Sequence, residues 1–501
     1  MTTMLLASLL LLIVNVCLAS HPPRSFPTTL QNIPKPLQYT EAALVHFKAR
    51  KYGHRLHRGS SCDAPVSLLY AKRNGDGDRR YSPLDYGGDP TGHLDSTKAV
   101  HSAMQALLAN LNKTAVPFMA SGIRNLGGAM LDLAGGVYLI SSPIVAPNFV
   151  GNIRFGGSGT LRASTSFPKD RYLIEIGSSE TCKPKDSQNV CNEFVTIENL
   201  FFDSSHVAAG GVKVSMTMGT TVSNSFFIGF NQAGIMVDQG HETMVSECWL
   251  AEYYWSEKHA QSACKNGEDG SVGISVNGQD NIISNVIVFD FTCLGVLVNG
   301  AASLIQGVHS WNGGGVAISV NGTYDIQERI VDSYLDYSTL QIVNPKFVLV
   351  EGNFFFNTHA VLLGSKVQQL IMRNNIYSLD KYGGKNSIVV DVGAKCGNGV
   401  KIEEDINGEQ TVSKTAFVRQ TRVKRSLFQK DATVWVFNFE KDLVFGQIDF
   451  ILYSLEHSFG SQQSATHVAQ KENATSVKIV VSEPVTATVH IEVAECQNVP
   501  N

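Results

Sequence analysis

Acidic residues recur at the end of a repeated apolar run in the middle of the chain. Glu252 follows the run WLA, Asp290 follows IVF, and Asp336 ends the run YLD. Two carboxyl groups that flank a glycosidic bond can hydrolyse it, because one protonates the leaving oxygen while the other activates water or attacks the sugar. We therefore take Asp290, Glu252 and Asp336 as candidate catalytic residues. The alternative is that they are ordinary polar residues of solvated turns.

A second group of titratable residues lies in the stretch VDQGHETMVSE, residues 237–247. It contains Asp238, His241, Glu242 and Glu247, and Asp280 falls near Glu242 one repeat later. A histidine beside carboxylates can orient a hydroxyl group or titrate near neutral pH. We add His241 and Glu242 to the candidate catalytic residues, with a surface turn held together by a His–acid contact as the alternative.

One short sequence unit returns through the middle of the chain. Its copies are TIENLFFD at 196, TVSNSFFI at 221, MVSECWLA at 244, IISNVIVF at 282, LIQGVHSW at 304 and RIVDSYLD at 329. A second short strand such as AGIMV, VGISV or LGVLV lies between consecutive copies. A period of about twenty residues with few helix formers predicts a right-handed parallel β-helix, an all-β solenoid. A leucine-rich repeat has a similar period but requires a Leu and Asn consensus that is missing here.

The solenoid would stack the candidate carboxylates along its length. Strands of neighbouring turns lie about 4.8 Å apart, so Glu252 and Asp290 would be one spacing apart and Asp336 about two spacings further. Asp290 and Asp336 would then approach the roughly 6.5–9.5 Å separation of an inverting glycosidase.

The fourth position of the repeated unit has a different role. It reads Asn199, Asn224, Glu247, Asn285, Gly307, Asp332. Here a structural role, with side chains bonded along the coil at a bend, is favoured over ligand binding.

The rest of the chain divides into four predicted segments. Residues 1–20 are apolar and read as a secretory signal, and residues 21–78 form a leader of uncertain order. Residues 79–400 hold the solenoid with a helix at its start, and residues 401–501 read as a small C-terminal antiparallel β domain. The repeat is interrupted once, by an insertion within EYYWSEKHAQSACKNGEDG, and insertions in solenoids often lie on the binding side.

Cysteines and sequons fit an oxidising, extracellular compartment. Removal of the signal would leave eight cysteines, of which Cys182 with Cys191 is the first expected disulfide and Cys248 with Cys264 the next. Buried free thiols are the alternative. Glycosylation sequons begin at Asn112, Asn321 and Asn473.

The stretch LDYGGDPTGHLDSTKAV, residues 84–100, precedes an amphipathic helix that Asp95 or Ser96 would cap. It has neither the Gly-Lys-Ser/Thr of a phosphate loop nor the alternating acids of a calcium loop. It resembles the signature that opens the β-helix of the pectate lyase superfamily, and the C-terminal segment resembles that of quartet-type plant polygalacturonases, relatives of glycoside hydrolase family 28. The family's catalytic motifs match poorly: the chain offers Asn231-Gln232-Ala233, Gly240-His241-Glu242 and Arg422-Val423-Lys424, and no Asp-Asp pair.

The resemblance implies a secreted enzyme that hydrolyses α-1,4-galacturonosyl linkages of pectin in the plant cell wall, without a metal or organic cofactor. The partner would be this polysaccharide, and we expect a monomer that contacts no membrane once the signal is cleaved. A net charge of −4 also disfavours nucleic acid. Candidate substrate-binding residues are the cations Lys258, Arg373, Arg422 and Lys424 and the sugar platforms Trp255 and Trp311. Two alternatives remain, a calcium-dependent pectate lyase and a non-catalytic pectin-binding protein.

Overall fold

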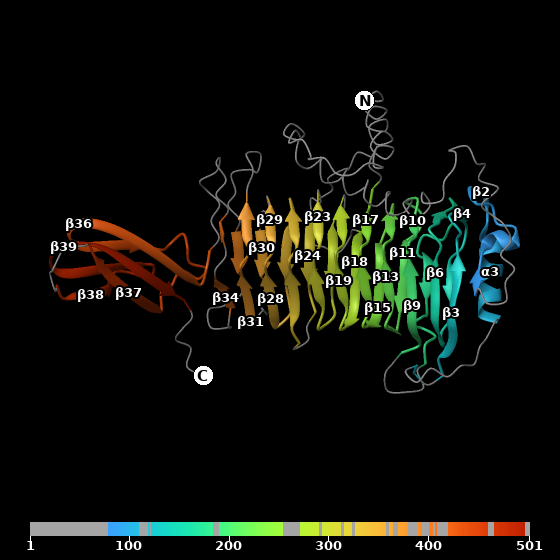
Figure 1. The fold of residues 1–501 in the computed structure, drawn as a ribbon, viewed down its shortest axis with the longest axis horizontal. Coiled ribbons are helices and arrows are strands. Elements are labelled where there is room, and N and C mark those ends of the chain that lie inside the picture. The colour runs from blue at the N-terminus through green and yellow to red at the C-terminus, as the bar shows by residue number, and fades with distance from the viewer. Residues whose placement is uncertain are drawn as a thin grey trace, which may run out of the picture. The chain divides into compact units, whose positions relative to one another are not determined.

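Short parallel strands stacked along one axis make up most of this computed structural model (Figure 1). The structure describes residues 79–109, 119–120, 122–183, 190–253, 271–289, 293–311, 315–322, 326–356, 360–363, 369–378, 389–392, 400–403, 406–407, 419–458 and 465–495. The predicted fold, an all-β parallel β-helix with an N-terminal helix and a C-terminal antiparallel β domain, is confirmed. Within the described part of the chain, no helix is both long and apolar enough to cross a membrane.

Each turn of the coil contributes one strand to a 12-stranded parallel sheet. Its strands are β2 (Thr91–Asp95), β4 (Val137–Ile140), β7 (Thr160–Ala163), β10 (Phe201–Asp203), β14 (Phe226–Ile228), β17 (Trp249–Ala251), β20 (Ile287–Phe289), β23 (His309–Trp311), β26 (Tyr334–Asp336), β29 (Phe354–Phe356), β32 (Ile376–Ser378) and β35 (Ile406–Asn407). The central residue of a typical strand here, such as Leu250 or Leu335, is fully buried in the core. The first and third residues therefore point outward, because side chains alternate along a strand.

Two further lines of strands form a 23-stranded sheet. The first line, which precedes the 12-stranded sheet in most turns, is β1 (Arg80–Tyr81), β3 (Arg124–Asp132), β6 (Val150–Gly156), β9 (Asn192–Glu198), β13 (Thr221–Ser223), β16 (Met244–Ser246), β19 (Ile282–Ser284), β22 (Leu304–Gln306), β25 (Glu328–Val331), β28 (Phe347–Glu351), β31 (Gln369–Arg373) and β34 (Val400–Glu403). The second line, which follows it, is β5 (Ile144–Ala146), β8 (Tyr172–Ile176), β11 (Gly210–Ser215), β15 (Ala233–His241), β18 (Val272–Gln279), β21 (Leu294–Val298), β24 (Val316–Val320), β27 (Thr339–Ile342), β30 (Ala360–Leu363) and β33 (Val389–Val392), with β12 (Thr217–Met218) bridging to the first line.

The stretch around residue 89 forms a turn at the start of the coil. After the short 3-10 helix η2 (Pro83–Tyr86), the Asp89 carboxylate accepts hydrogen bonds from the backbone N–H groups of Thr91, His93 and Leu94 at 2.9, 3.0 and 2.7 Å. These bonds, with one from the Thr91 hydroxyl, hold the Asp89 pKa well below its usual range. The carboxylate thus serves the turn rather than a ligand.

Helix α3 (Thr97–Ala109) follows directly, and both predicted caps take part in starting it. The Ser96 carbonyl accepts the first helical bond, from Val100 N–H at 3.0 Å, while the Asp95 carboxylate accepts the Thr97 N–H at 2.8 Å. The apolar side of the helix, including Val100, Met104 and Leu107, packs into the main core.

A left-handed residue makes the corner between the first line of strands and the 12-stranded sheet. The φ angles of Asn199, Asn224, Asn285 and Asp332 are 58°, 44°, 52° and 51°. Asn and Asp tolerate this region better than other residues with a side chain, which explains their recurrence in the sequence unit. The Asn224 amide donates to Asn199 Oδ1 at 2.6 Å. The structural role predicted for this position is confirmed.

The residue after each corner points into the core, and asparagine there extends the hydrogen bonding between turns. Asn353 is buried; its Oδ1 accepts the Ser333 N–H at 2.9 Å, and its Nδ2 donates to the Ile330 carbonyl at 3.0 Å and to Asn375 Oδ1 at 3.0 Å. Cys248 occupies the same inward position, with its thiol 3.2 Å from the Ser246 carbonyl.

Cysteine pairing was predicted only in part. Cys182 and Cys191 form the expected disulfide, and Cys293 is also disulfide-bonded. The predicted bond between Cys248 and Cys264 is wrong, because Cys248 is a buried free thiol facing the core.

The C-terminal segment forms a separate antiparallel sheet. Its long strands β36 (Arg422–Asn438) and β39 (Ser476–Ala494) pair along most of their length, and β37 (Phe450–His457) and β38 (His467–Lys471) also pair with β39. One face carries its own apolar core, built around Trp435, Phe437 and the alternating valines of β39.

Glu328 is an ionisable group in the interior of the coil. It is 1% exposed at the start of β25, where its Oε2 accepts the Ser303 N–H at 2.8 Å. Burial raises the pKa of this carboxyl to about 7, against the opposing effect of the hydrogen bonds from Ser303 and Ala302. The folded protein therefore keeps a proton on Glu328 at pH values where the unfolded chain has lost it.

Asn353→Ala removes the acceptor for Ser333 N–H and the donor to the Ile330 carbonyl, both inside the coil. Each unpaired buried group costs about 1–3 kcal/mol, so we expect the free energy of unfolding in urea to fall by about 2–4 kcal/mol. Asn277→Ala, at an exposed position of β18, is the control and should change it by less than about 0.5 kcal/mol. Equal effects of the two substitutions would refute a stabilising role for the interior asparagines.

Glu328→Gln should remove a pH dependence of stability. Because the folded pKa of about 7 exceeds the ordinary value of 4.5, wild type should lose stability as pH rises from about 4.5 to 7, by about 3 kcal/mol for this group. The variant keeps the acceptor for Ser303 N–H but cannot ionise. Urea titrations at pH 5 and pH 8 measure the free energy of unfolding of both proteins. If the variant and wild type differ by the same free energy at both pH values, the raised pKa of Glu328 is contradicted.

Candidate active site on the 12-stranded sheet

Asp336 lies on the outer face of the 12-stranded sheet, at the end of β26. Its neighbour Leu335 points into the core, so Tyr334 and Asp336 point outward together. Asp336 pairs in register with Phe356, and Leu335 pairs with Ser310, the residue before Trp311. Asp336 is nevertheless only 4% exposed. A carboxylate on an outer face is thus enclosed by its neighbours, which is the setting that shapes acid–base groups in enzymes.

Aromatic rings occupy the other outward positions of β23, β26 and β29. We call the outward residues of β23, β26 and β29 other than Asp336 the aromatic face; they are His309, Trp311, Tyr334, Phe354 and Phe356. The His309 and Tyr334 rings stack with centroids 4.7 Å apart, Tyr334 and Phe354 are 5.0 Å apart, and Phe354 and Phe356 are 6.1 Å apart. All five side chains are partly exposed. Such a surface can receive the C–H face of a sugar ring.

His309 acts here as an aromatic ring rather than as a base. Burial lowers its pKa to about 4, so the imidazole is neutral at the pH of most extracellular fluids. Its stacking on Tyr334 agrees with the packing role that its place inside a repeated strand suggests. Asp336 is the one carboxyl group among the described outward residues of β23, β26 and β29.

Glu252 lies at the same edge of the 12-stranded sheet as Asp336, but three strands earlier in the coil. It follows β17 and is 9% exposed. Ala251, the residue before Glu252, pairs in register with Phe289, and Phe289 pairs with Trp311. Three strand spacings, roughly 14 Å, separate β17 from β26. Glu252 and Asp336 are too far apart to flank one bond, so a pair would require Asp290, which lies outside the described residues.

The His241 group forms a separate site at the other end of β18. His241 Nε2 is 3.2 Å from Asp280 Oδ2, and Nδ1 is 3.9 Å from Glu242 Oε1. All three side chains are about half exposed. Strand β18 rises by seven residues, roughly 23 Å, between its two ends. This length separates the His241 turn from the edge of the coil where Glu252 lies. The structure thus brings His241 to Asp280, but does not bring His241 or Glu242 to Asp336.

The three predicted substrate-binding cations that the structure describes belong to sheets other than the one that carries the aromatic face. Arg373 is on β31 in the 23-stranded sheet and pairs with Glu351 at 2.9 Å. Arg422 and Lys424 are on β36 and both contact Glu492, at 3.1 and 3.6 Å. Lys258, Trp255 and the sequon residue Asn112 lie outside the described residues. Asn321 and Asn473 are exposed, as a glycosylation site requires, and Trp311 alone of the predicted platforms is placed on the aromatic face.

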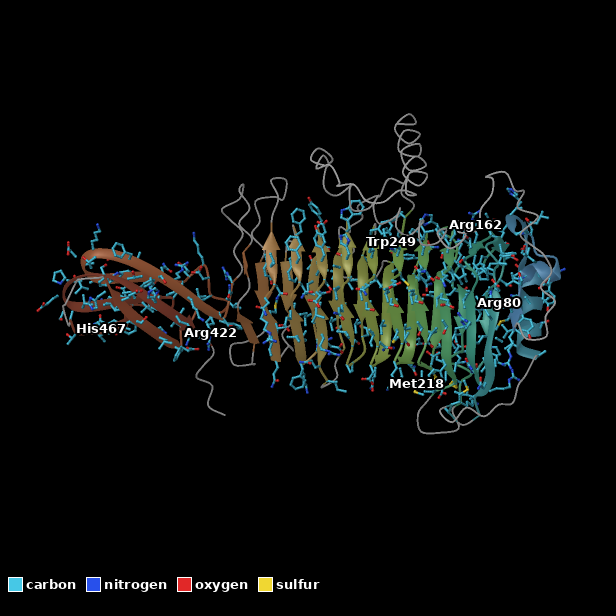
Figure 2. All side chains as sticks on the ribbon, in the orientation of Figure 1. Arg80, Arg162, Met218, Trp249, Arg422 and His467 are labelled. Atoms are coloured by element: carbon cyan, nitrogen blue, oxygen red, sulfur yellow. A yellow bond between two sulfur atoms is a disulfide. The ribbon has the colours of Figure 1, made fainter. Side chains whose placement is uncertain are left out.

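Two features of the site were missed from the sequence. The aromatic face was already present in the aligned units, where the sixth and eighth positions read His309 and Trp311, then Tyr334 and Asp336. Arg162, on the same outer face at β7, was also missed because it precedes the repeats (Figure 2). In the part of the chain that is described, no three His, Cys, Asp or Glu side chains gather as metal ligands would.

Comparisons with known proteins find one family model and several distantly similar solved structures. A family model described as rhamnogalacturonase A/epimerase, pectate lyase-like, matches residues 82–318. Among solved structures, ORF18 of Geobacillus virus E2 has a TM-score of 0.49 at 13% identity, covering 81% of this chain and 77% of that one. A mutant tailspike protein of E. coli bacteriophage HK620, in complex with a pentasaccharide, has a TM-score of 0.45 at 11% identity, covering 90% and 99%.

A curated plant protein gives the decisive similarity. Polygalacturonase QRT3 of Arabidopsis thaliana is 31% identical over 443 residues, which cover 83% of this chain and 84% of that protein. The aligned length includes far more than one repeat, so chance similarity among short β-strands does not account for it. The chain belongs to the quartet-type polygalacturonase family of pectate lyase-like β-helix proteins.

Proposed function

We propose that this protein is a secreted polygalacturonase that hydrolyses α-1,4-galacturonosyl linkages of pectin in the plant cell wall. The observation that carries the proposal is the 31% identity to a plant polygalacturonase across 83% of the chain. The outer face around Asp336 adds chemical support, because it joins an enclosed carboxylate to partly exposed aromatic rings. Residues 1–20 would direct the chain to the secretory pathway.

In this proposal Asp336 is one of two catalytic carboxyl groups, and Asp290 is the other. Two strand spacings, roughly 10 Å, separate β20 from β26, which suits a pair wide enough to hold a water molecule. One carboxyl gives its proton to the leaving glycosidic oxygen while the other takes a proton from water. The water oxygen bonds to the anomeric carbon as the carbon–oxygen bond to the leaving sugar breaks, so the anomeric configuration inverts.

The aromatic face would hold the sugar next to Asp336. Tyr334 and Phe354 are partly exposed with ring centroids 5.0 Å apart, and sugar C–H groups pack well on aromatic surfaces. Trp311 lies on the neighbouring turn and can contact the adjacent sugar. Glu252 would then contact the polysaccharide at a sugar some turns away from the cleaved bond, and it would not act in the bond-breaking step.

The nature of the products tests the reaction. Purified protein incubated with de-esterified polygalacturonate should release reducing ends without forming unsaturated sugars, with or without a chelator. Hydrolysis adds water across the bond, whereas elimination leaves a double bond that absorbs in the ultraviolet. Unsaturated products that require calcium would support the lyase, and binding without any product would support a non-catalytic protein; either result contradicts the proposal.

Asp336→Asn should lower kcat on polygalacturonate by at least about a thousandfold, because it removes a group that transfers or accepts a proton. Asp332→Asn is the matched control, since Asp332 lies on the same turn at an exposed corner position where asparagine is favoured. It should retain activity. Thermal unfolding of both variants checks the fold. Full activity in folded Asp336→Asn would exclude this residue, and the same test on Asp290→Asn examines its proposed partner.

A further inference from the structure

A second feature of the outer face lies on β7 and β10, six and five strands before β26. Arg162 and Asp203 pair in register there, and Arg162 Nε donates to Asp203 Oδ2 at 2.8 Å. Asp203 is nearly buried, whereas the Arg162 side chain is 43% exposed. A buried acid therefore holds a solvent-facing guanidinium group. Figure 2 shows Arg162 at the same edge of the coil as Trp249.

The Asp203 carboxylate is itself fixed. Its Oδ1 accepts hydrogen bonds from the Ser205 N–H at 3.0 Å and from the Ser205 hydroxyl at 3.1 Å. Arg162 contacts Asp203 through Nε, and within the described residues no other hydrogen bond engages its guanidinium. The terminal amino groups of Arg162 thus remain for a ligand, in the planar arrangement that binds a carboxylate with two hydrogen bonds.

An aromatic residue lies on the same outer face, on the strand next to Arg162. Phe201 is two residues before Asp203 on β10, so both point outward, and it pairs in register with Thr160 of β7. The Phe201 ring is partly exposed and stacks on Phe226 with centroids 4.8 Å apart. A ring surface next to a fixed guanidinium matches a sugar acid, whose C–H face needs an apolar support and whose carboxylate needs a cation.

The charge distribution of the outer face makes Arg162 distinctive. The outward residues of the described strands from β10 to β29 include two acids, Asp203 and Asp336, and neither lysine nor arginine. His309 adds no charge, because its pKa lies near 4. Among the described outward residues from β7 to β29, Arg162 is therefore the one cation that a polyanion would meet.

We propose that Arg162, positioned by Asp203 and flanked by Phe201, forms a distal subsite that binds the carboxylate of a galacturonate residue. The inference rests on the proposed function and specifies that the acidic polysaccharide extends from the aromatic face to Arg162. Six strand spacings, roughly 29 Å, separate β7 from β26. The subsite therefore belongs to a long substrate: it contributes to binding of a polymer and not to cleavage of a short oligomer, and it distinguishes acidic from methyl-esterified chains.

The test compares Arg162→Gln with Arg154→Gln. Arg154, on β6, is the matched control because it also pairs with one acid, Glu198, and its side chain is 47% exposed, but it belongs to the 23-stranded sheet. Binding is measured by affinity electrophoresis in gels containing polygalacturonate. Loss of a charge-assisted bidentate contact should weaken binding by Arg162→Gln about tenfold or more. Arg154→Gln should bind like wild type.

Two further measurements distinguish the loss of carboxylate binding from a general loss of polysaccharide binding. Arg162→Gln should raise KM on polygalacturonate with kcat unchanged, and it should bind fully methyl-esterified galacturonan as wild type does. Asp203→Asn should weaken polygalacturonate binding in the same ester-dependent way. Equal binding by Arg162→Gln and Arg154→Gln, or equal losses on acidic and esterified chains, would overturn the subsite. If wild type binds but cleaves nothing, the proposed function fails while the electrophoresis still decides the subsite.

Discussion

Hydrogen bonding between successive turns determines where every outward side chain of this coil lies. Each turn pairs in parallel register with the next, and a left-handed residue such as Asn224 or Asn285 closes one corner of the turn. A register shift by one residue would exchange outward Asp336 with core residue Leu335. The inward asparagines Asn353 and Asn375 extend the same bonding into the interior. The candidate site is therefore a consequence of strand register more than of any loop.

Much of this architecture could be predicted from the sequence. The returning unit gave the period of the coil, and the repeated Asn or Asp in its fourth position indicated a backbone bend. Both follow from local rules, because strand alternation and left-handed φ angles depend on residues close together in the chain. The Cys182–Cys191 bond and the start of helix α3 are local in the same sense.

Features that depend on distant turns were predicted poorly. Cys248 was paired with Cys264, but the corner at Glu247 turns Cys248 into the core. The burial of Glu328 depends on Ser303, which lies one turn earlier. Arg373 and Arg422 were chosen for their charge, yet pairing places them on other sheets. The sequence motifs also suggested His241, which the length of β18 separates from the aromatic face.

We propose that galacturonan lies along one continuous face, which carries Asp336 beside aromatic residues and Arg162 near the start of the coil. The most direct measurement is a crystal structure of the Asp336→Asn variant with a bound oligogalacturonide long enough to span several turns. We predict sugar density on the aromatic face, with a glycosidic oxygen within hydrogen-bonding distance of residue 336. Density instead beside His241 and Asp280, with none on the 12-stranded sheet, would contradict the assignment of the active site.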